Sequence, residues 1–182
     1  MSHETYLIAP PDMEAAAIAD RLAAVLTRPG LAALLLPRGN RDLATYHDLI
    51  RAVAPQAQDA NVAVLIEGEP EWVSELGVDG LHVTAGVGAV RAALDTLKPD
   101  YIVGAGNIRS RHDAMQKAEA GVDYILFGPL SGRIDDAQRE LAAWWSETME
   151  IPCVFADPAA TDIDPSGCEF AGVGIDALEH TA

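Results

Sequence analysis

Short apolar runs alternate along this chain with longer segments in which apolar residues recur every three or four positions. The short β-branched or aliphatic runs predict buried strands, and the period of 3.6 residues predicts amphipathic helices. Eight strands are expected, at residues 5–9, 31–36, 62–66, 80–84, 101–104, 123–127, 152–156 and 170–173.

The helical period is clearest in four segments between these strands. Their apolar faces consist of Ile18, Leu22, Val25 and Leu26; Leu43, Tyr46, Ile50 and Val53; Val87, Val90, Leu94 and Leu97; and Leu141, Trp144, Trp145 and Thr148. A further helix is expected after Ser110, because Ser110 and Asp113 have the spacing of a capping box. We expect Ala114, Met115 and Ala118 to form its buried face.

Strands that alternate with helices imply parallel βαβ units, and eight such strands imply a (β/α)8 barrel. The 182 residues fall short of the roughly 250 that are typical of this α/β fold. The shortage lies late in the chain, because residues 157–169 leave no room for a full helix and only 175–179 follow the last strand. The expectation is one domain over residues 1–182, a compact (β/α)8 TIM barrel with shortened final helices. A doubly wound open sheet with fewer strands is the alternative.

The composition supports a protein with a large hydrophobic core, and the cytoplasm is its expected location. The hydrophobic content is 49%, but no run of 18 uncharged apolar residues suggests a membrane span. Residues 1–5 lack the basic start and apolar block of a signal peptide. Without that signal, Cys153 and Cys168 are expected to be reduced core residues rather than a disulfide.

The net charge of −16 disfavours nucleic acid as a partner, because its phosphates would be repelled at long range. A small phosphorylated ligand remains compatible with this charge, since backbone N–H groups and helix N-termini can hold it. The sequence does not decide whether the chain forms a homo-oligomer.

Several segments, in order, resemble the thiamine phosphate synthase and TenI family. The most specific is Asp123-Tyr-Ile-Leu-Phe-Gly-Pro129, and weaker matches are Thr5-Tyr-Leu-Ile8, Gly77-Val-Asp-Gly-Leu-His82, Ile102-Val-Gly-Ala105 and Ile151-Pro-Cys-Val154. The resemblance implies a barrel that joins a pyrimidine diphosphate to a thiazole phosphate and releases pyrophosphate, with Mg2+; the TenI branch tautomerises the thiazole phosphate. It also implies a phosphate anchor at the carboxyl-end face of the barrel.

The resemblance places a phosphorylated small molecule against the loops that follow the strands. The candidate binding residues in these loops are Arg38, His82, Gly104, Gly106, Gly128, Ser131, Gly132, Arg133, Gly172 and Gly174. Gly104 and Gly106 would let a ligand approach the backbone closely, and Gly172 and Gly174 offer backbone donors at the start of a helix. Ser131, Gly132 and Arg133 stand where the family has a Thr-x-Thr-Lys element that clamps pyrophosphate. For His82, a position facing the barrel mouth and a packed position between strand and helix are both open.

Other family positions are altered in this chain. The magnesium carboxylates of the family are missing, which leaves Glu67 as the inward metal candidate, with Glu69 as the alternative, and makes Mg2+ binding doubtful. Ile108 stands at the place of the TenI catalytic histidine, and Asp157 in the seventh loop would repel a phosphate unless it is turned away.

Two hypotheses therefore remain: a synthase-like transferase, and a catalytically reduced binding or regulatory protein on the same scaffold. A third, an epimerase or decarboxylase barrel, is disfavoured because Lys98 and Lys117 lie outside the strand ends.

Overall fold

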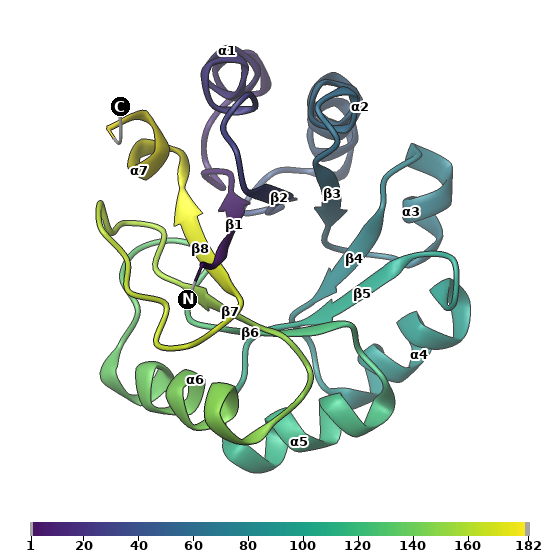
Figure 1. The fold of residues 1–182 in the computed structure, drawn as a ribbon. Coiled ribbons are helices and arrows are strands. Elements are labelled where there is room, and N and C mark those ends of the chain that lie inside the picture. Colours follow the sequence, from purple (N-terminus) through teal and green to yellow (C-terminus); the bar gives the residue numbers. More distant parts are fainter. Residues whose placement is uncertain (1, 181–182) are drawn as a thin grey trace.

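The computed structural model describes residues 2–180 as a closed barrel of eight parallel strands, ordered β1 to β8 around the ring (Figure 1). The strands are β1 (Glu4–Ile8), β2 (Leu31–Leu36), β3 (Ala63–Ile66), β4 (Gly80–Val83), β5 (Ile102–Ala105), β6 (Tyr124–Phe127), β7 (Cys153–Ala156) and β8 (Phe170–Gly174). Every strand lies within one residue of its predicted bounds. Pairing of β1 with β8 closes the ring, so the (β/α)8 barrel is confirmed and the open sheet is excluded.

The helices surround the strands (Figure 1). Their apolar stripes pack in the core against the strands. They are α1 (Ala15–Val25), α2 (Leu43–Asp59), α3 (Glu71–Leu76), α4 (Val87–Leu97), α5 (Arg111–Ala120), α6 (Asp136–Thr148) and α7 (Ile175–Glu179). Helix α3 was not predicted, because it has six residues and Val73 is its one buried side chain. Leu43 is an exception to its predicted face, being 44% exposed at the start of α2.

The shortened end of the barrel is confirmed. No helix lies between β7 and β8 among the described residues, and α7 is five residues long. The 157–169 segment instead passes outside the strands between α6 and α7 (Figure 1). It is attached to α6 by Ser146, whose Oγ donates to Ser166 O at 2.9 Å. An irregular segment thus covers the strands where other barrels of this class have a helix.

Helix α5 begins as predicted but buries a different face. Ser110 Oγ accepts a hydrogen bond from Asp113 N at 3.1 Å, which confirms the predicted N-cap. Ala114 is fully buried, whereas Met115 is 39% exposed, so the prediction that Met115 faces the core was wrong. Lys117 takes the inward position instead and is 2% exposed.

Mainly apolar side chains fill the barrel interior. They come from alternate positions of β1, β2, β3, β6 and β7: Tyr6, Ile8, Ala33, Leu35, Leu65, Tyr124, Leu126, Val154 and Ala156. Successive residues of a strand face opposite sides, so the neighbouring positions pack against the helices. Burial on both sides explains why the strands read as continuous apolar runs. The carboxyl ends of all eight strands meet at one mouth, where the polar loops begin.

Candidate functional site

A cavity of about 480 Å3 at the barrel mouth brings together three of the predicted site residues. Arg38 follows β2, Glu67 follows β3 and Ser131 follows β6, and all three line it. Its remaining walls are mainly apolar or glycine: Pro11, Pro37, Gly39, Pro129 and Leu130. Residues that are 29 to 93 positions apart in sequence thus face one space, because parallel strands end at the same rim.

Arg38 and Glu67 form the charged part of this cavity. The backbone N–H of Arg38 donates to Glu67 Oε2 at 2.8 Å, and the Thr84 side chain also hydrogen-bonds to this carboxylate. Burial raises the pKa of Glu67, and the hydrogen bond from Arg38 opposes that rise. The Arg38 Nε donates to Arg41 O at 3.1 Å, which leaves its two Nη groups without a partner among residues 2–180.

Arg41 has a structural role beside this cavity. Its guanidinium donates to the backbone carbonyls of Pro37, Arg38, Pro10 and Met13. These bonds hold the loop after β1 against the loop after β2. Burial lowers the pKa of Arg41, and four of its five N–H donors are already used. Arg41 therefore positions Arg38 and does not offer a free cation to a ligand.

Arg133 is paired with the protein. Its Nε donates to Asp157 Oδ1 at 3.0 Å, and Arg139 Nη2 donates to Asp157 Oδ2 at 3.2 Å. The N–H of Ile134 also donates to Asp157 Oδ1, and the Asp157 residue is 2% exposed. Asp157 is thus turned away from the mouth, so the repulsion that its sequence position suggested does not arise. The Arg133 side chain is 63% exposed and lines a separate cavity of about 200 Å3 with Gly128.

The predicted glycines of β5 make room for aromatic side chains. A Cβ on Gly104 would lie 2.0 Å from the Tyr124 ring, and one on Gly106 would lie 2.5 Å from His82 Nε2. These glycines were predicted to let a ligand approach the backbone closely. In the structure, protein side chains occupy the space beside them. Their observed role is packing at the top of the barrel interior.

His82 belongs to a buried polar chain inside the barrel. Tyr6 Oη and Tyr124 Oη are 2.7 Å apart, and His82 Nδ1 lies 2.7 Å from Tyr124 Oη. His82 also stacks on the Tyr124 ring, with ring centroids 5.7 Å apart. Burial, assisted by the charge of Lys117, lowers the pKa of His82 to about 3, so the imidazole is neutral. Its position is inside the barrel, which is neither of the two places that the sequence left open.

The glycines around β8 divide between packing and a small cavity. Gly172 packs inside the barrel, where a Cβ would lie 2.9 Å from the Ala156 Cα. Gly174 precedes α7 and lines a cavity of about 170 Å3 with Ser131 and Gly132. Asp12 and Asp176 line the same cavity, so an anion there would meet two carboxylates.

The mouth cavity offers a single carboxylate, that of Glu67, to a magnesium ion. Within residues 2–180, no group of three or more His, Cys, Asp and Glu side chains could hold a metal ion. Glu67 lines the mouth cavity without a second carboxylate, and it already accepts hydrogen bonds from Arg38 N and Thr84. Mg2+ takes one or two carboxylates together with ligand phosphates and water. Glu67 alone would be the protein's whole contribution.

Two clusters of polar side chains were not predicted from the sequence. Tyr6 and Tyr124 lie at inward positions of β1 and β6, which strand alternation alone could have indicated. A second group surrounds Lys117 beneath the loop after β5. The signal for it was present in the sequence, since Lys117 is three residues after Ala114 on the inward face of α5.

A closed parallel barrel with cavities at the carboxyl ends of its strands defines the class of (β/α)8 barrel proteins that bind ligands in their βα loops. The sequence model of the family described as thiamine monophosphate synthase (TMP-TENI) matches residues 5–156. The chain belongs to this family.

Similar proteins agree with this assignment. The thiamine-phosphate synthase of Hyphomonas neptunium is 33% identical over 96% of this chain and 86% of its own length. That of Rhodospirillum centenum is 31% identical over 97% of this chain and 90% of its own length. The structure of a thiamine phosphate pyrophosphorylase from Pyrococcus furiosus covers 97% of this chain and 90% of its own, with a TM-score of 0.76 and 16% identity. This last likeness establishes the fold alone. None of the helices within residues 2–180 is long and apolar enough to cross a membrane.

Proposed function

We propose that this chain is a thiamine-phosphate-synthase-like protein that binds a phosphorylated small molecule of the thiazole phosphate type in the mouth cavity. The observation that carries the proposal is the convergence of Arg38, Glu67 and Ser131 on one cavity of about 480 Å3. A cavity of this size holds a small heterocycle with a phosphate group.

Arg38 is the residue that binds the phosphate in this proposal. Its Nη groups are free, its Nε is fixed on Arg41 O, and its backbone is fixed on Glu67. A guanidinium held in this way donates two parallel hydrogen bonds to phosphate oxygens. Ser131, which follows β6, adds a hydroxyl to the lining of the cavity. The apolar wall of Pro37, Pro129 and Leu130 is suited to the ring of the ligand.

The synthase reaction asks the protein mainly for positioning and electrostatics. The bond from the pyrimidine methylene carbon to the pyrophosphate oxygen breaks, and the thiazole nitrogen forms a bond to that carbon. Negative charge develops on the leaving pyrophosphate, so preorganised cations lower the barrier. Arg38 supplies one such cation at the mouth.

A second candidate is a binding protein on the same scaffold that no longer catalyses this reaction. The observation that favours it is the pairing of Arg133 with Asp157. The residue that stands at the place of the family's pyrophosphate clamp has one edge committed to a buried carboxylate. One free arginine serves a single phosphate better than it serves a pyrophosphate.

Calorimetry and a product assay separate these candidates. Thiazole phosphate is titrated into the protein, and both precursors are then incubated with it and Mg2+ while thiamine phosphate and pyrophosphate are measured. Binding with product supports the transferase, and binding without product supports the binding protein. Absence of binding refutes both.

Arg38→Ala is the variant that tests the mouth site. We expect thiazole phosphate binding to weaken at least tenfold, because a hydrogen bond to a charged group contributes about 1.5–3 kcal/mol. Arg51→Ala is the matched control, because Arg51 is exposed on α2 and its one ion pair within residues 2–180 is with Asp48 of the same helix. Equal affinities of Arg38→Ala and the unchanged protein would remove Arg38 from the site.

A further inference from the structure

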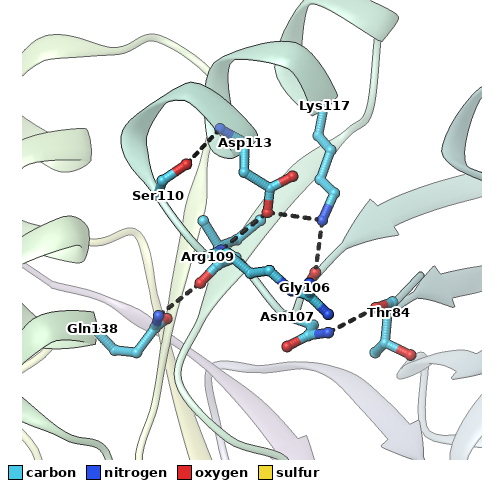
Figure 2. A network of polar contacts seen from close by, with 9 residues as sticks. Thr84, Gly106, Asn107, Arg109, Ser110, Asp113, Lys117 and Gln138 are labelled. Atoms are coloured by element: carbon cyan, nitrogen blue, oxygen red, sulfur yellow. Dashed lines mark hydrogen bonds and ion pairs between the residues drawn. The ribbon is translucent and has the colours of Figure 1, made fainter. Parts of the chain in front are cut away.

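A second polar cavity lies beside the loops that follow β4 and β5, and it shares no lining residue with the mouth cavity. Its volume is about 220 Å3, and its walls are Thr84, Ala85, Gly86, Asn107, Arg109, Asp113 and Lys117. Figure 2 shows Thr84, Asn107, Arg109, Asp113 and Lys117 of this lining, which come from α5 and from the ends of β4 and β5. Nothing in the proposed function uses this cavity.

Lys117 provides a buried cation at the base of the cavity. Its side chain is 2% exposed, and its Nζ donates to Gly106 O at 3.3 Å and Asp113 Oδ2 at 3.1 Å. An ammonium group has three donors, and these two partners use two of them. A lysine is almost never fully buried without compensation, because desolvation of its charge is costly. An additional anion at the third donor would complete the coordination of this ammonium.

Arg109 adds a second cation at the rim. Its backbone N–H donates to Asp113 Oδ2 at 3.0 Å, whereas its guanidinium has no partner among residues 2–180. Asn107 links the loop after β5 to the end of β4, because its Nδ2 donates to Thr84 O at 3.1 Å (Figure 2). Asp113 is the one carboxylate of the cavity, and both Lys117 and the Arg109 N–H already satisfy it. The lining therefore carries two positive charges against one negative charge, in a chain with a net charge of −16.

Helix α4 contributes to the same wall. It begins at Val87, directly after the lining residue Gly86, and the Gly86 N-cap has no side chain to accept the first N–H groups. The N–H groups of Val87 and Gly88 have no acceptor among the described residues. Unsatisfied donors in the first helical turn favour a negatively charged ligand.

We propose that this cavity is a second anion site, which binds a phosphate group as free inorganic phosphate or as the phosphate of a phosphomonoester. Lys117 and Arg109 hold the phosphate oxygens, and Asn107 and the α4 N-terminus shape the wall around them. Charge-assisted hydrogen bonds from an ammonium and a guanidinium are the usual protein contacts of phosphate. The inference is independent of the mouth site, because the two cavities use different residues.

Titration with inorganic phosphate, followed by amide NMR of the 15N-labelled protein, tests this site directly. At constant ionic strength, the amide resonances of Val87, Gly88 and Asn107 are expected to shift and to saturate. Arg109→Gln should weaken this response at least tenfold, and Lys117→Met should abolish it. Arg38→Ala is the matched control and should leave these shifts unchanged.

Two outcomes would overturn the proposal. One is a set of shifts that do not saturate or that sodium chloride reproduces. The other is an equal response of Arg109→Gln and the unchanged protein. Arg109→Gln carries the test even if Lys117→Met fails to fold, because Arg109 is exposed and its guanidinium holds no other group.

A parallel titration with thiazole phosphate identifies the source of the phosphate group. Tighter saturation of the same amides by thiazole phosphate assigns the site to a phosphomonoester, and saturation by inorganic phosphate alone assigns it to the free ion. Shifts confined to residues 38–39 and 131–132 would mean that phosphate binds only at the mouth, which refutes the second site and leaves the proposed function intact.

Discussion

Replacement of His82 by glutamine is expected to remove a pH-dependent component of the stability of the barrel. The imidazole is 1% exposed, and its Nε2 has no hydrogen-bond partner among the described residues. Burial and the charge of Lys117 lower its pKa from the ordinary 6.5 to about 3. The folded protein therefore holds His82 neutral at pH values where the unfolded chain protonates it.

The sign and size of the effect follow from linkage. Below pH 6.5 the unfolded state binds a proton that the folded state does not bind until about pH 3, so stability falls as the pH is lowered through this interval. The slope is about 1.4 kcal/mol per pH unit. Between pH 7 and pH 5 the unchanged protein should lose about 2 kcal/mol through His82 alone. Glutamine does not titrate, so His82→Gln lacks this loss.

Urea unfolding followed by tryptophan fluorescence measures the effect, because Trp145 is buried in the core. The stability difference between the unchanged protein and His82→Gln should shrink by about 2 kcal/mol between pH 7 and pH 5. The comparison cancels the carboxylates, which titrate in both proteins. The same substitution at exposed His112 is the matched control for loss of an imidazole. A difference that is equal at both pH values, or an NMR titration of His82 near pH 6.5, would refute the reasoning.

Two further substitutions or reagents test the packing of the barrel. Gly104→Ala should destabilise the protein by about 3 kcal/mol or more in thermal unfolding, because the new Cβ would lie 2.0 Å from the Tyr124 ring. Gly88→Ala is the control: its Cβ enters open space in the first turn of α4, so this variant should be as stable as the unchanged protein or slightly more stable. The Cys153 and Cys168 thiols are buried, and the hydrogen bond between them, together with burial, raises the pKa of Cys153, so a thiol reagent should label both slowly in the native protein and quickly in urea. Rapid native labelling of either would contradict the burial, and absence of labelling in urea would contradict the reduced state.

The sequence by itself determined the order and the bounds of the strands. In a parallel barrel the strands are covered on both faces, so each strand appears in the sequence as an uninterrupted apolar run, such as residues 31–36. The number of runs then indicated closure of the barrel. Local spacing was sufficient for the N-cap at Ser110 and for the short helix after β8. These features depend on neighbours a few residues apart, which periodicity reports.

The family resemblance located the mouth but did not define the environment of each site residue. Arg38, Glu67 and Ser131 line one cavity as their places after β2, β3 and β6 suggested. Arg133, also assigned to the phosphate, instead holds the buried Asp157, which is 24 residues later in the chain. A sequence motif lists the residues of a loop, but it does not state which charges pair within the folded protein.

Only the tertiary structure decided which polar groups are buried together. Tyr6 and Tyr124 are 118 positions apart and share a hydrogen bond, and His82 joins them from a third strand. Lys117 occupies a core position of α5 because Gly106 O and Asp113 compensate its charge. Such contacts depend on closure of the barrel, which brings strand ends that are distant in sequence to one rim. The apolar pattern specifies that rim, and the long-range pairing of polar groups decides what can bind there.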